Sequence, residues 1–237
     1  RRATYMGCWR WSGPMSQDVT PGTVLRAAAR VVYTELVTVV LTSLAFVVVS
    51  LPLVTVGAAV LALVETWTAI VTERDMGAPV TERGRLRLFG RSVRRHLRTG
   101  LPYSVILLAV TGLTVIYAVV GLTTQSGVFV IAAAVGVYLV IGVTLWCLRA
   151  ASITVRTEPT PSTRAGFEQA GLMLADRPYF TVLIATLAAV VVVVATVFRV
   201  AVPLLVPAVL AIVEVVVFEE LAGEGADAVR STYRRES

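Results

Sequence analysis

Lysine is absent from this sequence, and cysteine, histidine and charged side chains are scarce. All 21 basic side chains are arginines, and only 15% of the 237 residues are charged, against about 25% in a typical soluble domain. The two cysteines, Cys8 and Cys147, lie far apart, which excludes a disulfide framework and a cysteine-based zinc site. The low charge argues against an ordinary soluble protein.

Apolar residues make up 57% of the chain, and they are gathered into long runs. The longest run extends from Val31 to Thr72 and is broken near its middle by a turn-like stretch, Ser50 to Gly57. Because roughly 20 helical residues cross a hydrocarbon core about 30 Å thick, this run is long enough for two crossings. Proline suits the first turn of a new helix, so we expect Pro52 and Gly57 to form the turn of a membrane hairpin.

The same reasoning along the whole chain predicts an all-α, polytopic membrane protein with six transmembrane helices. The expected spans are 31–51, 53–72, 101–121, 127–148, 179–198 and 200–218. They would form a single membrane domain over 23–220. A disordered extension at 1–22 would precede it, and a charged tail at 221–237 would follow.

Two loops between the expected spans are polar and contain amphipathic helix patterns. In the first, 73–100, the apolar residues Leu86, Phe89, Val93 and Leu97 recur at helical spacing. The other face of this helix is basic, with Arg87, Arg91, Arg94, Arg95 and Arg98. Such a helix can lie in the headgroup plane against anionic lipid, or it can dock a protein partner, and the sequence leaves both readings open. A second surface helix is expected over 164–176.

Arginine is distributed very unevenly among the connecting segments. The N-terminal segment, the two polar loops and the C-terminal tail contain 20 of the 21 arginines, and the opposite turns contain only Arg199. Because short cytoplasmic segments are enriched in arginine and lysine, we expect both termini and both surface helices to be cytoplasmic. Arginines that flank apolar spans set topology, so nucleic acid is not an expected partner. The expected location is the plasma membrane.

The hairpin turn and the basic loop resemble the YesL-like membrane proteins, a family whose domain has no known function. The resemblance rests on the turn at 50–58, on Phe89 with the segment 94–97, and on the stretch 166–178. It covers about residues 25–220, although the helix before the turn lacks the family's asparagine. The resemblance implies a multi-span plasma-membrane protein, often linked with carbohydrate uptake or breakdown, and implies no catalytic residues.

Three carboxylates lie within the expected spans, where ionisable groups are costly and mark candidate functional sites. Glu35 lies near the cytoplasmic start of the first span, whereas Glu65 and Glu214 lie well inside the second and sixth at similar depths. Two carboxylates at one depth could share a proton or bind a cation. Alternatively, each carboxylate faces the helix bundle and is satisfied there by hydroxyl or N–H groups.

The sequence contains no paired-aspartate or serine–histidine set within a span, no glycine-rich phosphate loop and no selectivity filter. We therefore expect a non-enzymatic accessory or scaffolding protein with no metal and no cofactor. Its expected partners are the lipid bilayer, anionic headgroups and a cytoplasmic or membrane protein. The alternative function is a small secondary transporter in which Glu65 and Glu214 couple proton or cation movement.

Overall fold

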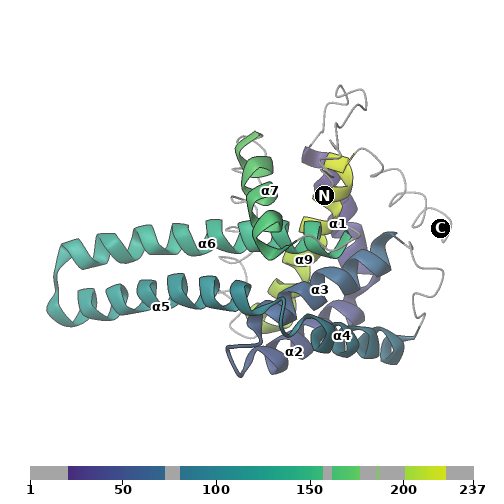
Figure 1. Cartoon of the computed structure of the whole chain (residues 1–237), viewed down its shortest axis with the longest axis horizontal. Coiled ribbons are helices and arrows are strands. Elements are labelled where there is room, and N and C mark those ends of the chain that lie inside the picture. The colour runs from purple at the N-terminus through teal and green to yellow at the C-terminus, as the bar shows by residue number, and fades with distance from the viewer. Residues whose placement is uncertain (1–20, 73–80, 157–161, 177–185, 187–200, 223–237) are drawn as a thin grey trace, which may run out of the picture.

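The computed structural model describes residues 21–72, 81–156, 162–176, 186 and 201–222 (Figure 1). Eight α-helices and no strand occur in this part of the chain, which confirms the all-α prediction there. The helices are α1 (Pro21–Thr34), α2 (Leu36–Ser50), α3 (Val56–Thr72), α4 (Glu82–His96), α5 (Leu101–Thr124), α6 (Gly127–Arg156), α7 (Thr163–Asp176) and α9 (Ala201–Ala222). Apart from residue 186, the predicted span 179–198 lies outside the described residues, and so do nearly all of both predicted terminal segments, although α1 and α9 include 21–22 and 221–222.

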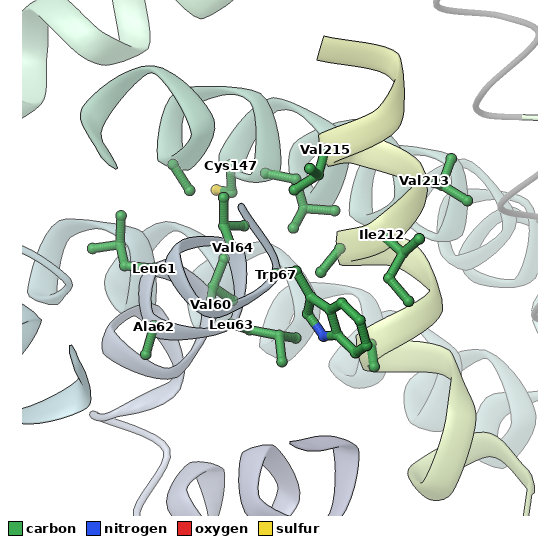
Figure 2. Close-up of a cluster of buried hydrophobic side chains, with 14 of the residues drawn as sticks. Val60, Leu61, Ala62, Leu63, Val64, Trp67, Cys147, Ile212, Val213 and Val215 are labelled. Atoms are coloured by element: carbon green, nitrogen blue, oxygen red, sulfur yellow. The ribbon is translucent and has the colours of Figure 1, made fainter. Parts of the chain in front are cut away.

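The centre of the fold is α3, which packs against α2, α4, α5, α6 and α9. Trp67, in its middle, is fully buried among side chains of α3 and α9 that include Leu63 and Ile212 (Figure 2). The first part of α5 and the last part of α6 join this helical body, and the rest of the α5–α6 hairpin projects away from it (Figure 1). The body therefore surrounds one apolar helix, whereas the hairpin exposes apolar side chains such as Ile131 and Leu122.

Two described helices, α5 and α6, are long and apolar enough to cross a membrane, and three spans result if the bent pair α1–α2 counts as one. The expectation of six spans is therefore not met within the described residues. Helix α3 is shorter than a full crossing, and so is Leu204–Phe218, the apolar segment of α9 whose side chains the structure describes. Helix α6 is longer than its predicted span 127–148, because its last residues continue into the body.

The predicted first span, 31–51, is two helices rather than one. Glu35 interrupts it with φ −106° and ψ 30°, and the axes of α1 and α2 differ by 87°. The apolar run gives no sign of this bend, because Arg85, the side chain that binds Glu35, comes from α4. The residues of 31–34 thus belong to α1, and the straight apolar helix begins at Leu36.

The turn between α2 and α3 lies near the predicted position, but α3 begins at Val56 instead of 53, so the prediction that Gly57 forms part of the turn is wrong: Gly57 lies in the first turn of α3. Leu53 has a left-handed φ of 51°, so Pro52 lies inside the turn and does not open the helix. The hydroxyl of Ser104 on α5 closes the turn, since it donates to the carbonyl of Val54 (2.6 Å) and accepts from the amide of Gly57 (2.8 Å). Gly57 lies directly against α5, because a Cβ at this position would overlap the carbonyl oxygen of Gly100.

Candidate functional site

Helix α4 carries most of the predicted surface residues, and its ends are well specified by the sequence. The Thr81 hydroxyl accepts a hydrogen bond from the amide of Gly84 at 3.3 Å, an N-cap that satisfies an otherwise unpaired donor. Glu82 lies in the first turn, and Arg94, Arg95 and His96 lie in the last turn. These charges have the signs that the helix dipole favours at each end.

The buried face of α4 differs from the predicted apolar stripe. Phe89 and Val93 are buried as expected, but Leu86 and Leu97 are 40% and 43% exposed. The side chains that are buried on α4 besides Phe89 and Val93 are polar, Ser92 and His96. They turn toward α3 because that helix carries a carboxylate partner for them.

That partner is Glu65, one of the three predicted site residues. Its Oε1 accepts from Nη1 of Arg95 at 2.9 Å, and its Oε2 lies 2.9 Å from Nε2 of His96. The hydroxyl of Ser92 also donates to Oε2. A carboxylate that accepts three hydrogen bonds from one neighbouring helix fixes the rotation of that helix about its axis, so Glu65 acts as an anchor for α4.

Glu35 makes a second contact of the same kind at the other end of α4. Arg85 binds both oxygens of Glu35, with Nη2 3.2 Å from Oε1 and Nη1 against Oε2. The hydroxyl of Thr38 lies 3.0 Å from Glu35 and 3.0 Å from Glu82. This paired guanidinium–carboxylate geometry is the strong form of the interaction, and it joins the α1–α2 bend to α4.

The remaining predicted arginines, three on α4 and Arg98 just after its end, point outward. Arg87, Arg91, Arg94 and Arg98 are exposed, and none of the four makes an ion pair or side-chain hydrogen bond within the described part of the chain. Their spacing of four, three and four residues places them on one face; we call these four residues the basic stripe. Arg95 was predicted to belong to this surface, but its guanidinium is bound to Glu65.

Glu214 lies in a different cluster, buried between α9 and α6. Its Oε1 lies 3.1 Å from Nε of Arg149 and 3.5 Å from the hydroxyl of Ser152. The Arg149 guanidinium also lies 5.7 Å from the centre of the Phe218 ring. From the sequence, Arg149 only marked the end of a predicted span. The one sign that an arginine would be buried was Glu214 itself, a carboxylate in an apolar helix with no oppositely charged residue near it in the sequence.

The three acids therefore belong to three separate clusters. Glu35 and Glu65 bind side chains of α4, and Glu214 binds side chains of α6. Among the residues that the structure describes, no group of three or more His, Cys, Asp or Glu side chains could hold a metal ion. The arrangement is one of structural ion pairs: two of them lie between the body and the exposed basic helix α4, and the third joins α6 to α9.

Comparisons with protein-family models, with curated proteins and with solved structures found no match for the chain. The resemblance to YesL-like proteins remains a prediction from the sequence. The best indication of function is therefore the geometry of α4 and of the two acids, Glu35 and Glu65, that hold it.

Proposed function

We propose that this chain is a non-catalytic membrane protein of the accessory or scaffolding kind, in which α4 is a basic docking face on the cytoplasmic side of the plasma membrane. One observation carries the proposal. Glu35 and Glu65 bind Arg85 and Arg95 and so hold α4 on the body, while the basic stripe faces outward. A helix fixed in this way holds the backbone of the four arginines in place before a partner binds, so that only their side chains remain to be ordered.

The position of α4 along the chain supports a place at the headgroup level. Arg98 precedes the start of α5, a candidate membrane span, by three residues. The exposed Leu86 and Leu97 each precede an arginine of the stripe by one residue, about 100° around the helix. They form an apolar edge beside the basic one, which suits a helix with one edge in the apolar boundary and another among phosphates. We therefore include anionic headgroups among the partners of the stripe, together with a cytoplasmic or membrane protein.

We also propose a topology with both termini cytoplasmic and, at most, the six crossings expected from the sequence. The turn between α5 and α6, 125–126, contains no charged residue, whereas the segments at the other ends of these helices contain Arg98 and Arg156. This asymmetry supports a hairpin whose turn faces outward. The α2–α3 hairpin returns to its starting side whether it crosses fully or not, so it leaves the orientation unchanged.

Affinity capture from native membranes tests the docking proposal. Wild type is compared with a variant in which Arg87, Arg91, Arg94 and Arg98 are all replaced by glutamine, and with the matched all-lysine variant. We expect wild type to capture a reproducible partner that the glutamine variant loses. Because lysine keeps the charge but loses the planar fork of arginine, retention by the lysine variant indicates general electrostatic attraction. Capture that is equal for wild type and the glutamine variant would count against the docking face.

The transporter alternative is less well supported by the geometry. A coupling carboxylate must exchange a proton or cation, but Glu65 and Glu214 each lie within about 3 Å of an arginine nitrogen on another helix. The link with carbohydrate uptake rests on the family resemblance alone, and a neighbouring sugar-uptake gene cluster would support it. Proton-coupled solute flux in proteoliposomes that is abolished by Glu65→Gln or Glu214→Gln would reverse this ranking.

A further inference from the structure

The bend at Glu35 gives the axis of α1 a direction different from that of α2. Helices α1 and α2 are separated by one non-helical residue and cross at 87°. Two consecutive helices at this angle cannot both run along the membrane normal. If one of them runs along the membrane normal, the other lies close to the membrane plane.

Composition decides which helix lies in the plane. Helix α2, Leu36–Ser50, has no charged residue, whereas α1 carries Arg26 and Arg30, both exposed. Charged side chains in the hydrocarbon core are costly, so α2 is the helix that enters the bilayer. Helix α1 then runs along its surface.

The exposed side of α1 has two adjacent stripes of different chemistry. Leu25, Ala29 and Tyr33 recur at intervals of four residues and are all exposed, with Tyr33 86% exposed. Arg26 and Arg30 follow each of the first two by one residue and form a neighbouring basic stripe. An apolar stripe with an aromatic residue beside a basic one is the pattern of a helix at the lipid–water boundary.

The other side of α1 is fixed to the protein. Ala28 and Val31 are buried in the core, where α1 packs against α9. At its end, Glu35 is bound by Arg85, so α1 and α4 are tied to the same point. The chemistry of the free face matches anionic phospholipid: phosphate for the two guanidinium groups and the upper acyl region for Leu25 and Tyr33.

We propose that α1 is a further membrane-surface helix, which lies flat on the cytoplasmic leaflet and binds anionic phospholipid headgroups through Arg26 and Arg30. This inference goes beyond the docking role of α4 and does not depend on any protein partner. The opposite arrangement is a broken span, in which α1 continues α2 through the membrane.

Spin-label depth measurements separate the two arrangements. Single cysteines replace Leu25, Ala29 and Tyr33 in a Cys8→Ser/Cys147→Ala background, and each labelled protein is reconstituted in nanodiscs that contain phosphatidylglycerol. A flat helix places the three labels at one depth, whereas an upright helix spreads them over about 12 Å, since each residue rises about 1.5 Å. Labels at Val37, Leu44 and Val48 of α2 are the control and should span about 16 Å if that helix enters the bilayer.

The anionic component is tested with the same labels in nanodiscs of phosphatidylcholine alone. We expect the α1 labels to be deeper with phosphatidylglycerol, and we expect Arg26→Gln/Arg30→Gln to abolish that difference while Arg164→Gln keeps it. Circular dichroism of each variant checks that the fold is retained. A graded depth along α1, labels exposed to water throughout, or depths that ignore lipid charge would each overturn the proposal.

Discussion

His96, the only histidine in the chain, lies with its Nε2 2.9 Å from Oε2 of Glu65, so that α4 is joined to α3 at a partly buried site. The same carboxylate binds Arg95 and Ser92. Glu65 thus determines which side of α4 is buried and, as a consequence, which arginines face outward. The proposed docking surface therefore depends on an acid that is not part of that surface.

Replacing Glu65 with glutamine should loosen α4. The amide keeps the shape of the side chain but loses the charge that Arg95 and His96 bind. Because charge-assisted hydrogen bonds are lost, we expect the free energy of unfolding to fall by about 1–3 kcal/mol. Limited trypsin digestion in detergent micelles measures this, since an undocked α4 offers many arginine cleavage sites. Glu168→Gln is the control, because Glu168 forms an exposed pair with Arg164 that should contribute little. Equal digestion rates in the two variants would exclude the anchoring role.

Gly57 and Gly100 should tolerate no side chain. A Cβ on Gly57 would overlap the carbonyl of Gly100, and a Cβ on Gly100 would overlap the backbone of Ala58. We expect Gly57→Ala to separate α3 from α5 and to lower the melting temperature strongly or to prevent folding. Gly112→Ala and Gly142→Ala are matched controls, because no atom lies within 4 Å of either new methyl group and alanine favours helix by up to about 1 kcal/mol. A melting temperature of Gly57→Ala equal to that of the controls would show that the close contact is wrong.

Arg149 and Glu214 should behave as a buried pair. Removing one partner leaves the other charge buried without compensation, which costs about 3–5 kcal/mol, so Glu214→Leu and Arg149→Met should each destabilise the protein. The double variant should be less destabilised than the sum of the two, since it leaves neither charge. Thermal unfolding of all four proteins in one detergent measures the coupling, and additive effects would mean that the two side chains do not interact.

Local patterns in the sequence predicted several of the helices themselves. The apolar runs predicted α5 and the first part of α6, the turn near Pro52 and the amphipathic helix that became α4. They did not predict the bend at Glu35 or the burial of Ser92 and His96, because each depends on a side chain distant in sequence: Arg85 for the bend and Glu65 for the burial. Periodicity describes one helix at a time and carries no information on such pairs.

The three acids also show that sequence patterns do not identify partners distant in sequence. The sequence identified Glu35, Glu65 and Glu214 because charges in apolar runs are costly, and it left open whether their role was coupling or structural. It could not identify Arg149 as the partner of Glu214, since an arginine after a span usually marks topology. Similar depth in two helices did not establish that Glu65 and Glu214 meet, because the two carboxylates bind different neighbours.

In the proposed topology, the basic stripe faces the cytoplasm and the α5–α6 turn lies on the outer side of the membrane. In the Cys8→Ser/Cys147→Ala background, single cysteines at Arg94 and Gln125 are treated in intact cells with a thiol reagent that does not cross membranes. We predict that the cysteine at Gln125 is labelled in intact cells and that the cysteine at Arg94 is labelled only after the cells are opened. Labelling of the Arg94 position from outside the cell would contradict the account.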